Sequence, residues 1–512
     1  MAPPAKKAKT SPPVAVGNIS SFFGPKKGAE AKQAASPKAA SSPSHSAPKK
    51  APEEPRASTP VGSPSPTASG APGPAEATTT PTKVEVKEVA ARITPEKPSP
   101  VGRRGPATPM STGKFHGFQG VKQSSWQQYN GLYKLRLKQL EGAAREEASR
   151  RWSMPKSSFL TDLTGFMSFS NREVVVVGVL FKDLKGRPNV IEEYKGSKAL
   201  LNQWKEDSSC LYTEKDTLWL EDAVMRVELE VSKEHLARLA TGFVVALKGT
   251  ATQAGTFTMS DFCFPRMPLP APLAAPKKDG PYLALMSGLD FGSDSTAASA
   301  RGKAFEFLKA HSVQQLVICA GLLPANGDGD RIKAALREIN VELPPLCESI
   351  VVQVMPGFGE PSNACLPQLQ FHSSLFQFQS SNFKRVGNPC GFKLGPMDIL
   401  GHSGQPVKDL LRCAQLEPME ALEMCLKARH LAPTAPDTLP TQPFEESDPF
   451  VMDAVPHLLF SGGHSKAETK WCDAGEQRGT QCICVPAFAK HHAVVLVNLQ
   501  NPREVRIEDF GS

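Results

Sequence analysis

The chain has 512 residues, a formal net charge of +8 and 47 prolines. Its length is sufficient for about two to four domains. No apolar run approaches the roughly 20 residues that span a bilayer, and the first ten residues, MAPPAKKAKT, lack the apolar core of a secretory signal. We therefore expect neither a membrane protein nor a secreted one, and we expect the eleven cysteines to be reduced thiols.

Residues 1–122 differ in composition from the rest of the chain. They contain 21 of the 47 prolines and 18 Lys and Arg against 7 Asp and Glu, whereas the remaining residues carry 41 basic against 44 acidic side chains. A segment with so few aromatic residues cannot bury enough apolar surface to offset its chain entropy. We therefore expect a disordered basic tail that precedes a nearly neutral globular part.

One short segment of this tail is apolar. Phe22 and Phe23 follow Ile19 at helical spacing, so one turn would place the three side chains together as a plug for a groove on a partner. The spacing resembles that of the peptide that binds the replication sliding clamp (PCNA), with Val16 where glutamine is usual. The alternative interpretation is a chance hydrophobic patch. A basic cluster of the nuclear-import type lies upstream, at Lys6, Lys7 and Lys9.

Residues 123–266 are expected to form a helical lead-in followed by a small barrel. The apolar spacing over 124–152 is helical, and the lead-in extends to about residue 170. Five or so short strands are predicted at 173–181, twice within 217–231, at 243–248 and at 255–264, with one helix that has Ser232 as its N-cap. This pattern is typical of an OB-type barrel over 171–266. Such a barrel is either structural or binds single strands through exposed aromatic residues, here Trp204 and Trp219.

A proline linker over 267–279 precedes a region in which strands and helices alternate. Strands are expected at 282–286, 313–320, 350–355, 456–460, 481–485, 493–499 and 504–508, and helices at 303–311, 330–339, 407–413 and 419–429. The strand at 456–460 is expected to end in a turn made by Gly462, Gly463 and His464. The alternation predicts a layered α/β sandwich over 280–512.

The chemistry of such a sandwich depends on the residues at its strand ends. A two-metal phosphoesterase needs oxygen and imidazole ligands there, because two cations clamp the attacking and leaving oxygens. The corresponding positions here are Ser287, Leu289, Leu322, Phe358 and His464. Only His464, together with His402, keeps a ligand type, and one or two imidazoles cannot hold two metal ions. We therefore expect a degenerate site with no metal, no other cofactor and no catalysis.

The body of the chain, roughly residues 125–511, resembles the small (B) subunits of DNA polymerase delta. The resemblance rests above all on the PTAPDTL sequence at 433–439, followed by Asp448-Pro449-Phe450. The YLALMSGL sequence at 282–289 and the GHSGQ sequence at 401–405 also contribute. This family combines an OB barrel with an inactivated calcineurin-like phosphoesterase domain. The implied fold class is α/β plus β, with the barrel packed on a calcineurin-like sandwich after the disordered tail.

The resemblance implies a non-catalytic accessory subunit that works in the nucleus. It would hold the cysteine-rich C-terminal region of the catalytic polymerase delta subunit, and a third, extended subunit through the OB face. DNA would be reached through the holoenzyme. A long tail with a clamp motif is not usual in this family. Our hypothesis is that the tail does here what the tail of another subunit does elsewhere, and contacts the sliding clamp. Two alternatives stay open: an active metal-dependent phosphodiesterase and an independent single-stranded DNA-binding protein.

Overall fold

The computed structural model of the chain describes residues 110–111, 130–169, 172–187, 210–278, 280–292, 295–325 and 329–511. The clamp-like motif (Val16, Ile19, Phe22, Phe23), the basic cluster (Lys6, Lys7, Lys9) and Trp204 lie outside the described residues. Within the described ranges, no helix is long and apolar enough to cross a membrane.

Among the described residues before the barrel there is one helix, α1 (Asn130–Trp152), in the region where the sequence predicts one or two helices. Leu140, Ala144 and Ala148 recur every four positions and are fully buried, so one stripe of α1 faces inward. This stripe packs against the valines of β2 (Glu173–Asp183) and β5 (Val244–Ala251). Two short 3-10 turns, Lys156–Ser158 and Leu163–Phe169, connect α1 to β2.

The predicted small barrel is confirmed. Its five strands close in the order β2-β3-β4-β6-β5, where β3 is Thr217–Glu221, β4 is Arg226–Glu230 and β6 is Phe257–Cys263. The alternating burial along β3 and β4 points every second side chain into the barrel. Helix α3 (Lys233–Arg238) lies between β4 and β5, and the predicted N-cap Ser232 accepts a hydrogen bond from the His235 backbone N–H.

Two six-stranded sheets pack face to face, and all their strands except the short β1 lie beyond the linker. The first has the order β10-β9-β8-β7-β16-β17, with strands Phe383–Arg385, Val351–Met355, Val313–Cys319, Tyr282–Met286, Ala493–Asn498 and Asn501–Asp509. The second has the order β1-β11-β12-β13-β15-β14, with strands Met110–Ser111, Cys390–Leu394, Met397–His402, Leu458–His464, Arg478–Pro486 and Glu468–Gly475. Buried side chains of both sheets, such as Val317 and Phe460, form one apolar cluster between them.

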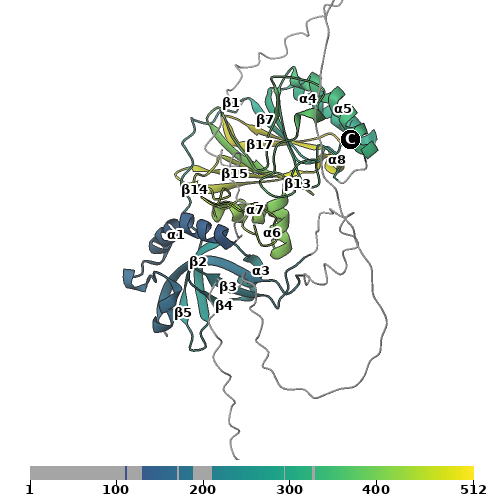
Figure 1. The fold of residues 1–512 in the computed structure, drawn as a ribbon. Helices are drawn as coiled ribbons and strands as arrows, with labels where there is room; N and C mark the ends of the chain where they lie inside the picture. Colours follow the sequence, from purple (N-terminus) through teal and green to yellow (C-terminus); the bar gives the residue numbers. More distant parts are fainter. Residues whose placement is uncertain are drawn as a thin grey trace, which may run out of the picture. The chain divides into compact units, whose positions relative to one another are not determined.

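Helices cover the outer faces of both sheets, which makes the sandwich a four-layered one (Figure 1). Helices α4 (Ser295–Ala310) and α5 (Gly329–Cys347) pack on the first sheet. Helices α6 (Gln405–Cys413) and α7 (Pro418–Lys427) pack on the second sheet and also on the barrel, and α8 (Phe488–His491) joins β15 to β16. One continuous apolar cluster therefore runs from the barrel interior through α6 and α7 into the sandwich.

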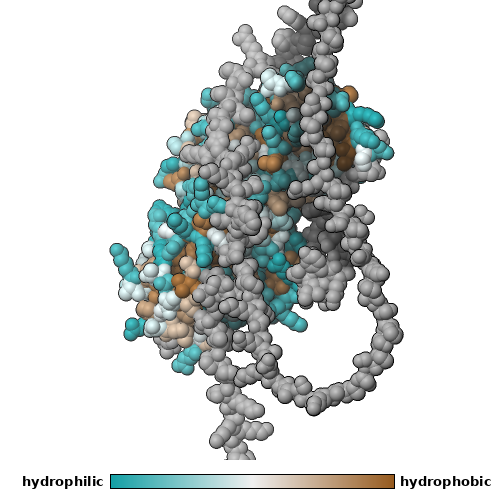
Figure 2. Space-filling view, viewed as in Figure 1, coloured by the Kyte–Doolittle hydropathy of each residue, from teal (hydrophilic) through white to brown (hydrophobic). Residues whose placement is uncertain are grey.

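The surface shows no single dominant apolar region on the face drawn in Figure 2, where hydrophobic residues are interspersed with hydrophilic ones. The large hydrophobic side chains that stay exposed among the described residues are Met167, Val224, Leu269, Val341, Leu369 and Ile507. Single exposed apolar side chains of this kind are ordinary on protein surfaces.

Several elements of the sandwich differ from the sequence prediction. Strands β10, β11, β12 and β14 are not predicted, because charged residues and glycines interrupt their apolar pattern. Helix α4 begins at Ser295 rather than at 303. Helix α5 continues to Cys347 although it contains Pro344 and Pro345, because its buried stripe continues through Leu343 and Leu346.

The prediction for the glycine turn is wrong. Strand β13 continues through Gly462 and Gly463 to His464, with a bulge between Ser461 and His464. Gly463 has φ +73, which glycine adopts without strain. Strands β12 and β15 pair with β13 up to Ser461, and β15 pairs with it again at His464, so the two glycines form a bulge inside the strand.

Candidate functional site

The ends of β7, β8 and β13 meet at the edge where the sequence predicts a degenerate metal site. Ser287, directly after β7, donates through Oγ to the Cys319 carbonyl oxygen (3.0 Å) and accepts from the Gly463 backbone N–H (2.8 Å). A Cβ atom at Gly462 would lie 2.2 Å from the same carbonyl oxygen. The structure thus brings Ser287 next to the end of β13, and the two sheets touch through a hydroxyl group and glycine backbone.

The apolar positions of the predicted set have packing roles. Leu289 and Leu322 are fully buried in the cluster that the first sheet forms with α4 and α5. Phe358 is half-buried in the loop after β9. None of the three side chains has an atom that could bind a cation or move a proton, so these positions supply apolar contacts.

Glu360, which the sequence reasoning did not identify, connects two of the strand ends. Its carboxylate accepts hydrogen bonds from the backbone N–H groups of Gly321 (2.9 Å), Leu323 (2.7 Å) and Gly357 (2.7 Å). Burial raises the pKa of Glu360 to about 7, although the backbone donors act in the opposite direction. A carboxylate three residues after a strand-end glycine is the signal in the sequence that could have located it.

Neutral amides and a hydroxyl occupy the neighbouring strand ends. Asn388 donates through Nδ2 to Gln368 Oε1 (2.8 Å), Ser403 Oγ (2.6 Å) and Gln405 Oε1 (2.6 Å). Gln405 in turn donates to Gln368 Oε1 at 3.0 Å. All four side chains are buried, and each forms a hydrogen bond with at least one of the others. This network joins the loop after β9 to the start of α6 without using any charge.

The two histidines of this edge are buried and neutral. Burial, and then His464, lower the pKa of His402 to about 3, and the ring accepts at Nδ1 from the Gly404 N–H (3.1 Å). Burial, and then Lys408, lower the pKa of His464 to about 4, and its Nε2 lies 2.7 Å from Ser461 Oγ. In the part of the chain that the structure describes, no group of three or more His, Cys, Asp and Glu side chains is arranged to hold a metal ion.

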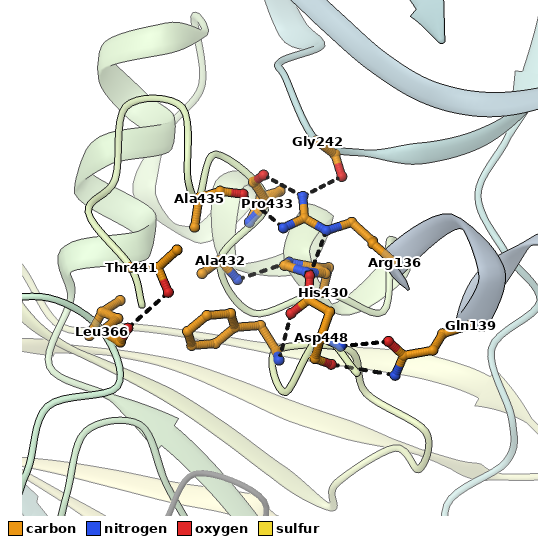
Figure 3. A network of polar contacts seen from close by, with 11 residues as sticks. Arg136, Gln139, Gly242, Leu366, His430, Ala432, Pro433, Ala435, Thr441 and Asp448 are labelled. Atoms are coloured by element: carbon orange, nitrogen blue, oxygen red, sulfur yellow. Dashed lines mark hydrogen bonds and ion pairs between the residues drawn. The ribbon is translucent and has the colours of Figure 1, made fainter. Parts of the chain in front are cut away.

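A second polar cluster joins α1 to the segment that contains PTAPDTL and Asp448 (Figure 3). Arg136 donates through Nε to Asp448 Oδ2 at 2.8 Å, and both side chains are fully buried. Three of the four other guanidinium N–H groups donate to the carbonyl oxygens of Gly242 (2.9 Å), Pro433 (2.8 Å) and Ala435 (2.8 Å). One arginine therefore connects the lead-in helix, the barrel and the late loop.

His430 completes this cluster. Its Nε2 lies 2.9 Å from Asp448 Oδ2, and its Nδ1 accepts from the Ala432 N–H at 3.2 Å. Burial, and then the Arg136 guanidinium, lower the pKa of His430 to about 4, so the imidazole is neutral at pH 7. Burial disfavours the charged form of Asp448 and by itself would raise its pKa, but His430 and Arg136 hold that pKa below the ordinary value. Asp448 is thus a buried carboxylate whose negative charge is paired with the guanidinium of Arg136, which stays positively charged.

Lys182 forms another connection between the barrel and the sandwich. Its ammonium group donates to the carbonyl oxygens of Leu239 and Cys413, both at 2.9 Å, and lies 4.5 Å from the centre of the Tyr212 ring. Burial lowers its pKa to about 8. Arg136 and Lys182 were not predicted. A charged residue inside the apolar stripe of α1 is the sequence signal that could have revealed Arg136.

Trp219, the described candidate for stacking on nucleic acid bases, already has a partner on its ring. The Arg226 guanidinium lies 4.7 Å from the ring centre, and the indole N–H donates to Thr217 Oγ1 at 3.1 Å. A base would have to displace this arginine from that face of the indole.

Comparisons with known proteins agree with this division of the chain. A family model described as "DNA polymerase delta subunit OB-fold domain" matches residues 128–262, which hold α1 and the barrel. A second model, which describes the B subunits of DNA polymerases alpha and epsilon, matches residues 283–470, which hold most of the sandwich.

The alignments with similar curated proteins include most of the length of those proteins. The DNA polymerase delta small subunit of Arabidopsis thaliana is 31% identical over 359 residues, which are 64% of this chain and 80% of that protein. The protein of the same name from rice is 29% identical over 355 residues, 64% of this chain and 82% of that protein. DNA polymerase delta subunit 2 of Drosophila melanogaster is 29% identical over 402 residues, 73% and 91% respectively.

Proposed function

The chain belongs to the family of DNA polymerase delta small subunits and is an accessory subunit of that polymerase, and from this premise we propose that it acts as a non-catalytic scaffold in the nucleus. The observation that carries the proposal is the chemistry of the strand ends. The positions where a hydrolase would hold metal ions are Ser287, Leu289, Leu322, Phe358 and His464. Ser287, Glu360 and His464 each form hydrogen bonds with neighbouring side chains or with the backbone.

The joint between barrel and sandwich suits a scaffold. Arg136, Lys182 and the shared apolar cluster hold the two parts together, so partners bound to each would keep a fixed relative position. In this proposal one partner is the cysteine-rich C-terminal region of the catalytic subunit. The other is a third, extended polymerase subunit that binds the OB barrel. DNA is contacted through the assembled holoenzyme, which agrees with the arginine that already occupies the Trp219 ring.

The tail adds a tethered contact with the sliding clamp in this proposal. Strand β1 pairs with β11 through Met110 and Leu394, which fixes the end of the tail to the sandwich. If the part of the tail before β1 is disordered, as its composition predicts, the roughly 90 residues between Phe23 and β1 reach about 50 Å. A weak apolar plug gains from such a tether when the clamp is already bound to the holoenzyme.

The direct test is assembly. The full chain is co-expressed with the C-terminal region of the catalytic subunit and analysed by size exclusion with light scattering. We expect a stable one-to-one complex that the variant Phe22→Ala with Phe23→Ala also forms, because the clamp motif is not used for assembly. Separate elution of the two folded proteins would contradict the scaffold proposal and leave only the fold in common with the family.

A further inference from the structure

Two cysteines of the sandwich lie with their sulfur atoms in contact. Cys472 in β14 and Cys482 in β15 have Sγ atoms 3.6 Å apart. The strand register pairs Cys472 with Thr480 and Cys482 with Lys470, so the cysteines are diagonal neighbours on one face of the sheet. That face packs against α7. The two thiols are therefore already directed toward each other.

The two thiols differ in access and in acidity. β14 is the edge strand of its sheet, and Cys472 is 7% exposed whereas Cys482 is fully buried. The contact with Cys482 lowers the pKa of the Cys472 thiol, with help from Lys470 and Lys427 and against burial and Glu423. The contact with Cys472, and then burial, raise the pKa of Cys482. Cys472 is therefore the thiol that ionises and meets a reagent from solvent first.

We propose that Cys472 and Cys482 are a site of reversible oxidation at which an intramolecular disulfide joins β14 to β15. The oxidant class is a small-molecule disulfide, such as oxidised glutathione. The Cys472 thiolate attacks one sulfur of that disulfide and releases one glutathione thiolate. Cys482 then gives up its proton, attacks Cys472 Sγ and displaces the second glutathione. Two cysteine thiols lose two electrons and two protons, and one glutathione disulfide becomes two glutathione thiols.

The edge position makes the required movement possible. A disulfide needs its sulfurs at about 2.0 Å, so they must approach from the present 3.6 Å. Among the described residues, β14 has a paired strand on one side only, and its register with β15 already shifts between Asp473 and Gly475. Closure would draw the edge strand toward β15 and hold it there. The amides of β14 should then open to solvent less often.

The test uses the full-length chain in a Cys210→Ser background, because Cys210 is exposed and would react separately. The reduced protein is incubated with oxidised glutathione, and its mass is measured without reduction. We expect a loss of the mass of two hydrogen atoms, a proteolytic fragment that links Cys472 to Cys482, and reversal by dithiothreitol. Hydrogen exchange of residues 468–475 should slow by several-fold in the oxidised protein.

Matched variants separate this proposal from general thiol chemistry. Cys472→Ala and Cys482→Ala should both abolish the mass loss, whereas Cys347→Ala, at a buried cysteine of α5, should leave it intact. Thermal melts establish that each variant is folded. A stable glutathione adduct on Cys472, a bond from Cys472 to Cys484, or no reaction in the folded protein would each overturn the proposal.

Discussion

Replacing Arg136 by methionine should destabilise the protein far more than replacing any arginine on the surface of the same helix. Methionine keeps much of the side-chain volume but removes the partner charge of Asp448, which is fully buried. It also leaves the carbonyl oxygens of Gly242, Pro433 and Ala435 without their guanidinium donors. Breaking one side of a buried ion pair costs about 3–5 kcal/mol, and we expect Arg136→Met to fall in that range.

The assay is urea unfolding at pH 7, followed separately by the fluorescence of Trp219 in the barrel and Trp471 in the sandwich, each observed in a background without the other tryptophans. Arg150→Met is the control, because Arg150 lies on α1 but is 65% exposed and, among the described residues, pairs with Glu147, so its loss should leave the free energy of unfolding almost unchanged.

Double replacement tests the reason for the expected loss. Arg136→Met combined with Asp448→Leu removes both charges, so it should be less destabilised than the sum of the two single variants. If Arg136→Met were no less stable than Arg150→Met, the buried cluster would not hold the barrel to the sandwich and the reasoning would fail.

Four further outcomes are expected. The folded protein holds three neutral histidines with lowered pKa values, His402, His430 and His464. At these three sites the unfolded chain therefore binds more protons than the folded protein below about pH 6.5. Their contribution to stability should be full above that pH and fall toward pH 4, by on the order of 1–2 kcal/mol per histidine between pH 7 and 5. Glu360, whose pKa is raised to about 7, acts in the opposite direction, but three histidines outweigh one carboxyl group, so an unchanged urea midpoint across this window would contradict the assignment. Glu360→Gln replaces one of the two acceptor oxygens with an amide N–H₂ group that faces at least one backbone N–H donor, and it should cost about 1–3 kcal/mol in the same assay, whereas the exposed control Glu306→Gln should cost nothing measurable. Phe22→Ala with Phe23→Ala should shorten the products that the holoenzyme makes with the sliding clamp but not those made without it. Equal shortening in both reactions would contradict the proposed contact between the tail and the clamp. Manganese-dependent hydrolysis of a phosphodiester should be absent, and activity that disappears in His464→Ala would refute the scaffold proposal.

The architecture follows from local patterns wherever burial repeats regularly. The β-branched runs of β2, β7 and β8 and the four-residue spacing of buried positions in α1 identify these elements without any tertiary information. Strands β11 and β14 are different. Their residues alternate with lysine, glycine or glutamate, and only pairing with a neighbouring strand makes them regular.

Part of the candidate site could be predicted from the sequence, and part of it could not. The sequence is sufficient to show which ligand types are missing at Ser287, Leu289 and Leu322, because that depends on residue identity alone. What replaces them depends on contacts between distant segments. Glu360 binds backbone N–H groups 37 and 39 residues away, and Gly463 stays in a strand because Ser287, 176 residues earlier, accepts its N–H. No local pattern contains such pairings.

The position of Arg136 in the chain has a consequence for biosynthesis. Its carboxylate partner is 312 residues further along, and its carbonyl partners in the late loop are almost as distant. Ribosomes add about 5–20 residues per second, so roughly 15–60 s separate the synthesis of the arginine from that of Asp448. During this interval α1 and the barrel emerge without the groups that neutralise the guanidinium in the native protein. Translation that stops before residue 448 should therefore leave a truncated chain that depends on chaperones, even though the five strands of its barrel are complete.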